Sequence, residues 1–476
     1  MPSERRSRES EWWEQGLRRR DFLALLGAGA VSLMTGGLYA ATAARRRPNV
    51  IVIVADDLGY SDLGCQGATD IPTPSIDSIA RSGVRFTNAY VSCPVCSPTR
   101  AGLMTGRYQE RFGHEFNAAW ENLEAGLPFS QITLADELKA AGYATGLVGK
   151  WHLGMAPRFN PVHRGFDEFF GFTGGSHVYL DPGANPAPRG TNPILRGTET
   201  VDEKEYLTDA LTREAAAYID RHQREPFFLY LCYNAVHVPQ QAPQNYLDRF
   251  SHIANDKRRT YAAMLSAMDD GVGAVLGRLR EAGLEQDTLI FFLSDNGGPA
   301  ETGSHNHPLR GGKGSVWEGG IRVPFLMQWK GRIKAGQTYD NPVIALDIFP
   351  TVTAAAGAKL PTDRIMDGVN LVPYVTGKRS RMPHEVLYWR YGWRHAIRRG
   401  NWKMRIGEEG AAPELYDLAN DIGEANDLAQ SKSELVQDLN ETLMRWESSL
   451  VPPLWPPQAA VPGSTTPAPA GSGAPR

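Results

Sequence analysis

Cysteine is scarce in this chain of 476 residues: there are four, at positions 65, 93, 96 and 232. So few cysteines cannot form a disulfide framework for a chain of this length. A surplus of one charge is also missing, because 50 Lys and Arg face 53 Asp and Glu, for a formal net charge of -3. No basic excess favours nucleic acid as a partner, and we expect none.

What is present is typical of a large globular protein. Hydrophobic residues make up 42% of the chain and charged residues 22%, which excludes a disordered or fibrous protein. The 49 Gly and 33 Pro indicate many loops, where binding and catalytic side chains are often carried. At roughly 100 to 200 residues per domain, the length predicts several domains.

The first 44 residues have the features of an export signal. The stretch Arg18-Arg19-Arg20-Asp21-Phe22-Leu23 resembles a twin-arginine signal, and an uncharged run from Phe22 to Ala44 contains the small-x-small site Ala41-Thr42-Ala43. We therefore predict a signal peptide over residues 1–44, the twin-arginine export machinery as a partner, and a periplasmic or secreted protein. An uncleaved membrane helix is the alternative, because the run is long enough to span a bilayer.

The rest of the chain divides into three predicted regions. Residues 48–378 are expected to form the catalytic domain, and residues 380–451 a small C-terminal subdomain. Residues 452–476 hold eight Pro among Ala, Gly, Ser and Thr. Such a segment cannot bury enough apolar surface to fold, which predicts a flexible tail.

Buried strands alternate with amphipathic helices along the catalytic region. Continuous apolar runs predict strands at 49–55, 143–149, 227–233 and 288–293, and helical spacing predicts helices at 134–141 and 261–282. This alternation predicts an α/β fold, a large doubly wound mixed or parallel sheet with helices on both faces.

A different pattern starts after about residue 380. Short strand-like runs broken by Gly occupy 386–391, 393–398, 402–406 and 414–417, and a helical repeat of Leu435, Leu439, Leu443 and Trp446 follows. The pattern predicts a small α+β subdomain with an antiparallel sheet and one helix. Its aromatic residues are interpreted as core.

Polar side chains follow the predicted strands of the catalytic region directly. These residues are Asp56, Asp57, Lys150, His152, His237, Asp295 and Asn296. In open α/β sheets, ligands bind beyond the carboxyl ends of the strands. We therefore expect these side chains to converge on one cleft.

The stretch Cys96-Ser97-Pro98-Thr99-Arg100 fits the Cys-x-Pro-x-Arg signature of the sulfatases. The blocks that accompany it in order are Ala55–Gly59, Gly149–Gly154, Ser294–Gly298, Gly311–Gly314 and Glu318–Pro324. From residue 48 to about 430, the chain thus resembles the type I, formylglycine-dependent sulfatases, similar to arylsulfatases and N-acetylgalactosamine-6-sulfatases. The resemblance implies an alkaline-phosphatase-like fold. A redox pair of Cys93 and Cys96 is the alternative for this stretch.

The resemblance implies that Cys96 is oxidised to formylglycine (3-oxoalanine) by a formylglycine-generating enzyme. One hydroxyl of the hydrated aldehyde would attack sulfur, and the second would expel sulfate by reforming the aldehyde. Pro98 near a helix start pre-sets φ, and the free N–H groups of such a turn face an incoming anion.

Asp56, Asp57, Asp295 and Asn296 offer only oxygen ligands, which suits a hard divalent cation and argues against zinc. The resemblance identifies the cation as Ca²⁺ and adds the modified Cys96 to its ligands. The alternative is that these residues only cap a turn and form a hairpin, which does not explain why both pairs end buried strands.

The same resemblance assigns cationic residues to the sulfate group. Arg100 would hold the nucleophile, while Lys150 and Lys313 would bind sulfate oxygens and neutralise charge in the transition state. Arg310, three residues before Lys313, could take its place if the alignment slips.

Two histidines and one aspartate receive proton-transfer roles. His152 would take a proton from the second hydroxyl when sulfate is expelled. His237 would bind near the leaving oxygen and act as its acid, together with Lys313. Asp295 would accept the proton of the attacking hydroxyl. A core or surface histidine is the alternative for each of the two.

Other positions are tied to the substrate more loosely. Ser176 resembles a family position that contacts the sulfate region, although its Gly-rich surroundings also fit a plain loop. His114, His305 and His307 could line the substrate side or lie in exposed loops. Residues 155–200 and 299–310 are the expected pocket walls, and Cys65 and Cys232 are expected to be ordinary buried thiols.

The function predicted from these observations is hydrolysis of a sulfate monoester of a carbohydrate or aryl alcohol. One alternative is a phosphonate or phosphate monoester hydrolase of the same superfamily. A second is an inactive relative that binds sulfated glycans. The motifs leave the alcohol open, because specificity lies in loops that they do not cover.

Overall fold

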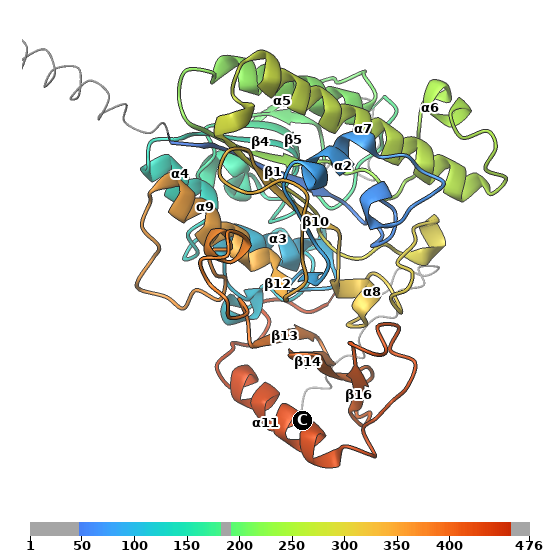
Figure 1. Cartoon of the computed structure of the whole chain (residues 1–476). Helices are drawn as coiled ribbons and strands as arrows, with labels where there is room; N and C mark the ends of the chain where they lie inside the picture. Colours follow the sequence, from blue (N-terminus) through green and yellow to red (C-terminus); the bar gives the residue numbers. More distant parts are fainter. Residues whose placement is uncertain (1–46, 182–191, 458–476) are drawn as a thin grey trace, which may run out of the picture. The chain divides into compact units, whose positions relative to one another are not determined.

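At the centre of the fold is a ten-stranded mixed sheet (Figure 1). The computed structural model describes residues 47–181 and 192–457. In spatial order the strands are β11 (Gln337–Tyr339), β2 (Val84–Phe86), β10 (Phe325–Trp329), β9 (Thr288–Ser294), β1 (Asn49–Ala55), β8 (Phe227–Cys232), β4 (Ala144–Lys150), β5 (Glu168–Phe172), β6 (Leu195–Arg196) and β7 (Glu199–Thr200). The run from β9 to β5 is parallel, and β10, β6 and β7 pair antiparallel with their neighbours. The predicted α/β class is confirmed.

Strand β1 shows why the sheet is covered on both sides. Val50, Val52 and Val54 pack into one hydrophobic core, while Ile51 and Ile53 pack into the other. Every residue of β1 is buried. A strand with two apolar faces needs helices on both sides of the sheet.

Two layers of helices provide that cover (Figure 1). One layer contains α2 (Pro74–Arg81), α5 (Leu207–Arg221), α6 (Gln244–Asp248) and α7 (Asp256–Glu281). The other contains α3 (Cys96–Thr105), α4 (Leu134–Ala140), α9 (Ile348–Ala356) and α10 (Val372–Val375). Helix α7 starts five residues before its predicted start, because the Asn255 side chain accepts the N–H of Arg258 and caps a polar first turn that apolar spacing could not reveal.

The C-terminal part forms the predicted antiparallel sheet and helix. The sheet is made of β13 (Val386–Tyr391), β14 (Arg394–Arg399), β15 (Trp402–Ile406) and β16 (Glu414–Asp417), and α11 (Ser433–Glu447) packs on it. The aromatic residues Trp389, Tyr416 and Trp446 are buried in its core, as interpreted from the sequence. Four others are partly exposed: Tyr388, Tyr391, Trp393 and Trp402. The indole N–H of Trp389 donates to the carbonyl of Val91, which follows β3 (Ala89–Tyr90) of a two-stranded sheet with β12 (Val343–Ile344).

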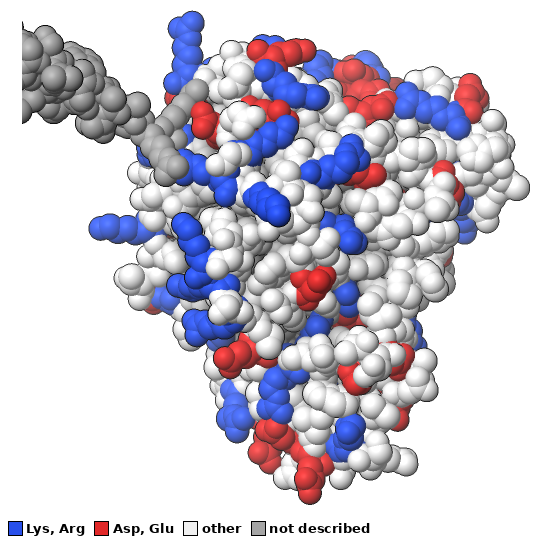
Figure 2. Space-filling model, in the orientation of Figure 1, with Lys and Arg blue, Asp and Glu red and all other residues white. Residues whose placement is uncertain are grey.

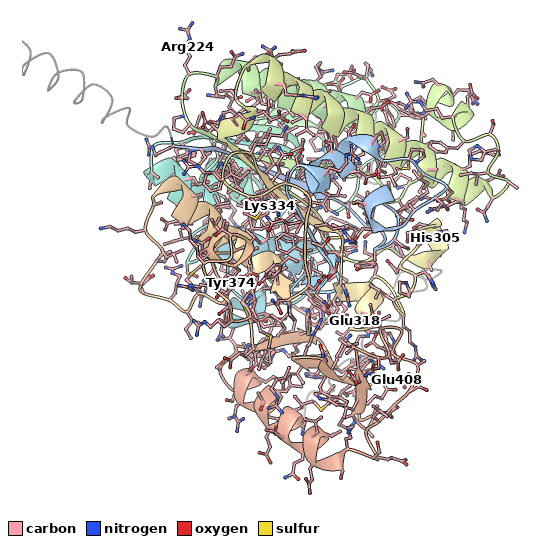
Figure 3. All side chains as sticks on the ribbon, in the orientation of Figure 1. Arg224, His305, Glu318, Lys334, Tyr374 and Glu408 are labelled. Atoms are coloured by element: carbon pink, nitrogen blue, oxygen red, sulfur yellow. The ribbon has the colours of Figure 1, made fainter. Side chains whose placement is uncertain are left out.

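Buried charges also join this sheet to the rest of the fold. Glu318, which is labelled in Figure 3, is at the start of α8 (Glu318–Ile321). Its carboxylate lies 2.9 Å from the ammonium group of Lys403 in β15. Glu424 contacts the same ammonium group at 2.8 Å. All three side chains are buried, so the sheet is attached through ion pairs as well as apolar packing.

The packed chain extends past the predicted boundary at residue 451. Trp455 is only 7% exposed and packs with Phe116, Ala118 and Ala125. The backbone N–H of Leu454 donates to Gly113 at 2.9 Å. The predicted tail is therefore wrong for residues 452–455, because one aromatic side chain anchors a segment that is otherwise rich in proline.

Several expectations fall on parts of the chain outside the described residues. These are the signal peptide over 1–44 and the tail from residue 458 onward. None of the helices in the described ranges is both long enough and apolar enough to cross a membrane. Basic and acidic side chains are both spread over the face drawn in Figure 2.

Candidate active site

Neighbouring strands bring the predicted polar residues to one edge of the sheet. Strands β9, β1, β8 and β4 are adjacent and parallel, so their carboxyl ends meet. Asp56 follows β1, Asp295 follows β9, and His237 follows β8, while Lys150 ends β4. Asp56, Asp295 and Lys150 are fully buried and His237 is partly exposed. The expected convergence is what the topology produces.

Cys96 is the first residue of α3 and lies at the same place. Its Sγ is 3.6 Å from Oδ1 of Asp56. Pro98 is in the first turn of the helix, as expected, and the side chain of Val95 offers no cap. Burial, followed by the charge of Asp295, raises the pKa of the Cys96 thiol to about 12. The unmodified side chain is thus a thiol at neutral pH, which makes it a poor nucleophile.

A group of possible metal ligands surrounds the sulfur atom. One ligand atom each from Asp56, Asp57, Cys96 and His237 lies within 4.8 Å of the others. The Nδ2 group of Asn296 donates to Asp57 at 2.7 Å, and Oδ1 of Asn296 is buried without a partner in the described part of the chain. A buried oxygen without a partner beside two carboxylates fits a cation ligand. The group could therefore hold a metal ion, with the oxygens of Asp56, Asp57 and Asn296 as hard ligands and Cys96 and His237 as softer ones.

Each carboxylate of the site has a cationic partner. Lys150 donates to Asp56, and the ammonium group of Lys313 lies 2.7 Å from Asp57. The guanidinium of Arg100 donates to Asp295 from Nε and Nη2, at 2.9 and 2.7 Å. A third donor of Arg100 binds the carbonyl of Lys150 at 3.1 Å. The cations are therefore held in position by carboxylates before any anion binds.

The carboxyl groups respond to this environment in opposite directions. Although burial alone would raise it, the neighbouring ammonium of Lys150 holds the pKa of Asp56 well below its usual range. Burial, followed by the negative charge of Asp56, raises the pKa of Asp295 to about 6. Two carboxyl groups with pKa values pushed apart are a common feature of sites that move protons.

Both predicted histidines lie in the site and both favour the neutral ring. Burial and then the charge of Lys150 lower the pKa of His152 well below its usual value. Burial and then Lys313 lower the pKa of His237. Nδ1 of His237 lies 2.6 Å from the carbonyl of Val238, which only accepts, so Nδ1 carries the hydrogen. Nε2 of the neutral His237 then has a lone pair and lies 3.6 Å from Asp57.

The reactive end opens into a cleft of about 380 Å³. It is lined by Cys96, Asn117, Ala118, Ala119, Trp120, His152, Met155, Gly174, Gly175, Ser176, Asn192, His237 and Lys313. Ser176 is therefore at the cleft, where the resemblance placed it. Asn192 holds the backbone around it, accepting from Gly174 and donating to the carbonyl of Ser176.

The residues that line the cleft differ in part from those predicted. None of the residues that line the cleft within the described ranges comes from 299–310, so that part of the expectation is wrong. Residues 117–120 line it instead. Sequence motifs could not find them, because this stretch lies between recognisable blocks and carries no charged side chain; the exposed aromatic residue Trp120 was the only available signal.

The three histidines that could line the substrate side do not line the cleft. His305 and His307 are exposed, and His305 is at the edge of the molecule in Figure 3. His114 is buried below the active-site turn, with Nε2 2.7 Å from Oγ of Ser97. Arg310 lies over the ring of Trp317 and donates to the carbonyl of Glu424, so Lys313 is the cation in the cleft.

The four cysteines are free thiols. Cys93 and Cys232 are fully buried, whereas Cys65 is only partly buried. Cys232 thus agrees with the expected buried thiol, and Cys65 does so in part. The site that emerges is a buried Cys96 with cations, carboxylates and two neutral imidazoles around it.

Two family models match the chain. The model described as Sulfatase matches residues 48–358. The model described as N-sulphoglucosamine sulphohydrolase, C-terminal, matches residues 312–449. Together they cover the described chain from β1 to α11.

Curated relatives and solved structures agree with that match. N-acetylgalactosamine-6-sulfatase of Mus musculus is 36% identical over 408 residues, which are 80% of this chain and 75% of the relative. Arylsulfatase A of Homo sapiens is 33% identical over 466 residues, 87% of this chain and 90% of the relative. The structure of Ps i-CgsB in complex with k-i-k-neocarrahexaose is 39% identical, with a TM-score of 0.83, covering 86% of this chain and 95% of that one.

Proposed function

The chain belongs to the sulfatase family and is a sulfuric ester hydrolase, and we propose that it cleaves a sulfate monoester of a carbohydrate or aryl alcohol with an oxidised Cys96 beside a bound calcium ion. The observation that carries the proposal is the meeting of five separate segments at one point. The carboxylates after β1 and β9, the cations Lys150 and Lys313, and the first turn of α3 are all within one network of contacts.

Formylglycine would supply at position 96 a hydrated aldehyde with two hydroxyl groups, one to attack sulfur and one to release sulfate. The surroundings of the unmodified Cys96 explain why the conversion to formylglycine is needed. A buried thiol with a raised pKa is neither a thiolate nor able to release a sulfate ester by reforming a carbonyl. The formylglycine-generating enzyme is the partner that this proposal requires.

Calcium would be held by Asp56, Asp57, Asp295 and Asn296, with the modified Cys96. It would supply positive charge that allows a sulfate ester to approach three carboxylates. The buried, unpartnered oxygen of Asn296 and the nearby carboxylates of Asp56 and Asp57 support these three ligands. Asp295 is directed mainly to Arg100, and its Oδ1 also accepts the N–H of Asp57 at 3.3 Å.

The cations of the chain would bind and orient the sulfate group. Lys313 and Lys150 present ammonium groups at the two carboxylates next to Cys96 and would share them with sulfate oxygens. Donors that are fixed before the reaction stabilise charge in the transition state without a cost of reorganisation. Arg100, held by Asp295 and a backbone carbonyl, would fix the position of the first turn of α3.

Protons would move through groups whose protonation states differ. The neutral His152 can accept a proton from the second hydroxyl at position 96. Lys313 can donate to the leaving oxygen because its ammonium group, which Asp57 keeps charged although burial alone would lower its pKa, carries protons. His237 has no proton on Nε2 in its neutral form, so it would orient the leaving group or pass on a proton.

The alcohol follows less directly from the relatives. Ps i-CgsB is solved with an oligosaccharide, and an N-acetylgalactosamine sulfatase and an arylsulfatase are similar over most of the chain. These names favour a carbohydrate or an aryl sulfate. The export signal predicted over residues 1–44 would take the enzyme to the periplasm or outside the cell through the twin-arginine machinery, where such esters are available.

Two measurements test the proposal. Mass spectrometry of the peptide that contains Cys96, from protein made in a host with the maturation enzyme, should give a mass about 18 Da below that of the cysteine form. Turnover of nitrophenyl sulfate should exceed that of nitrophenyl phosphate and phenylphosphonate. Dominant phosphonate or phosphate activity would favour the other hydrolases of the superfamily. An unmodified thiol without turnover would favour a binder of sulfated glycans.

A further inference from the structure

The cleft has a side that the reaction chemistry does not use. We name the four consecutive residues Asn117, Ala118, Ala119 and Trp120 the cleft wall. They line the same cleft as Cys96 but contribute no charge. Trp120 is 39% exposed, which is unusual for so large an apolar side chain beside a reactive group. A partly exposed indole in a cleft is typical of a ligand contact.

The cleft wall is fixed to the turn that carries the nucleophile. Oδ1 of Asn117 accepts the backbone N–H of Ser97 at 3.1 Å, and the N–H of Ala118 lies 3.4 Å from Oγ of Ser97. Ser97 follows Cys96 directly, so the wall and the reactive side chain keep a constant separation. Fixed placement of this kind is what a specificity site requires.

The end of the chain holds the wall from behind. Nε1 of Trp455 donates to the carbonyl of Asn117 at 3.2 Å, and the Trp455 ring packs edge-on against His114 at 4.8 Å. Ala118 is packed in the same small core with Phe116. The wall is thus a loop in secondary structure, but contacts with Ser97 and with Trp455 hold it in position.

We infer that the cleft wall binds the sugar ring that bears the sulfate, with the C–H face of a pyranose on the indole of Trp120 and its hydroxyl groups on Asn117 and Ser176. This assignment rests on the proposed sulfatase function. The face of an indole carries partial negative charge and attracts the polarised C–H bonds of a sugar. Within residues 47–181 and 192–457, Nδ2 of Asn117 has no hydrogen-bond partner, so a donor remains for a hydroxyl.

The mixture of polar and aromatic groups favours a sugar over a purely aryl alcohol. An aryl ring would cover the indole but would leave the amide of Asn117 and the hydroxyl of Ser176 without partners, and a desolvated polar group without a partner costs binding free energy. The cleft volume of about 380 Å³ is near the lower end for ligand sites. It therefore suits the sulfated ring itself, with any further sugar units outside.

The test compares variants of the wall on two sulfate esters. Wild type, Trp120→Ala, Trp120→Phe and Ser176→Ala are assayed with monosulfated hexoses and with nitrophenyl sulfate. We expect Trp120→Ala to raise KM for the preferred hexose sulfate about ten-fold with kcat nearly unchanged, and Trp120→Phe to recover most of that loss. Ser176→Ala should raise KM for the hexose sulfate by a larger factor than KM for nitrophenyl sulfate.

Leu123→Ala is the matched control, because Leu123 is a 53% exposed side chain three residues further on and does not line the cleft. It should retain wild-type KM for both esters. If Trp120→Ala and Leu123→Ala behave alike, the assignment of the wall is wrong. If Ser176→Ala weakens nitrophenyl sulfate as much as the hexose ester, the polar part of the assignment is wrong.

A binding readout separates this inference from the proposed function. Titration of the Cys96→Ala protein with the hexose sulfate should quench tryptophan fluorescence, and the same titration of Cys96→Ala/Trp120→Phe should not. If wild type prefers the phosphate or phosphonate ester of the hexose, the sulfatase proposal fails, and the wall variants are then compared on that ester. If sulfate is cleaved but the quench is unchanged by Trp120→Phe, only the wall assignment fails.

Discussion

The two sides of the cleft are built in different ways. The reactive side comes from residues that end or follow adjacent parallel strands, and most of them are buried and paired with an opposite charge. The cleft wall comes from a loop, is partly exposed, and is held by contacts to Ser97 and Trp455. The residues proposed for the reaction are therefore positioned by the sheet, whereas the cleft wall is held in part by the far end of the chain.

Because of this difference, substitutions on the two sides of the cleft should change different kinetic constants. A change on the reactive side removes an interaction made in the transition state and should lower kcat. A change on the wall removes contacts to the part of the substrate that does not react and should act mainly on KM. The predictions below test that division, from the largest expected effect to the smallest.

Cys96→Ala should remove activity while the fold survives. The polar contact of its Sγ is a long one, 3.6 Å to Asp56, and alanine removes only one sulfur atom from this buried position. Loss of a nucleophile lowers kcat by up to about 10⁶-fold. Turnover of nitrophenyl sulfate and the thermal unfolding midpoint check this. Substantial remaining turnover, or failure to fold, would contradict the assignment of Cys96 as the nucleophile position.

Lys313→Ala should lower kcat by about 10²- to 10³-fold, because it removes a fixed cation at the sulfate position. Arg310→Ala is its matched control. Arg310 is a cation three residues away, but it stacks on Trp317 and donates to Glu424 outside the cleft. Steady-state kinetics of both variants on one sulfate ester make the comparison. Equal losses would show that general charge, not position, matters here.

Lys313 and Arg310 also show what could be predicted from the sequence. The register of the Gly-rich block predicted Lys313 rather than Arg310 for the site, and Lys313 is the one that lines the cleft, since motif spacing is a local property. The class of the fold followed from apolar runs such as 49–55 for the same reason. Residues 117–120 are held in part by a contact with Trp455, more than three hundred residues later, which no local pattern encodes. The proline-rich end was predicted to be an unpacked tail, but the buried indole of Trp455 anchors its first residues.

Trp455→Ala should release the cleft wall and raise KM for the hexose sulfate several-fold with a smaller change in kcat. Truncating a buried Trp costs about 3 kcal/mol or more. The backbone N–H groups of Val451 and Leu454, which donate to Glu110 and Gly113, should exchange faster with solvent. Leu454→Ala is the control, since that side chain is 58% exposed. Unchanged exchange and KM in Trp455→Ala would mean that the wall is rigid without this contact.

The smallest expected effect is a dependence of stability on pH that comes from His114. This residue contacts Ser97 and Trp455, which hold the cleft wall. Burial, followed by the charge of Arg164, lowers the pKa of His114 to about 3, and its Nε2 lies beside Ser97. Below the ordinary histidine pKa the unfolded chain binds a proton that the folded protein does not. The free energy of unfolding should therefore fall by about 1.4 kcal/mol per pH unit from about pH 6.5 downward.

The variant His114→Gln keeps a donor for Ser97 but cannot titrate, so it should lose this part of the slope. At pH 5 the contribution of His114 amounts to about 2 kcal/mol relative to pH 8. Denaturant unfolding of wild type and His114→Gln at both pH values isolates it, because every other titrating group is shared. If the free energy of unfolding changes equally with pH in the two proteins, His114 is protonated in the folded state. The wall is then open to solvent on the side of His114.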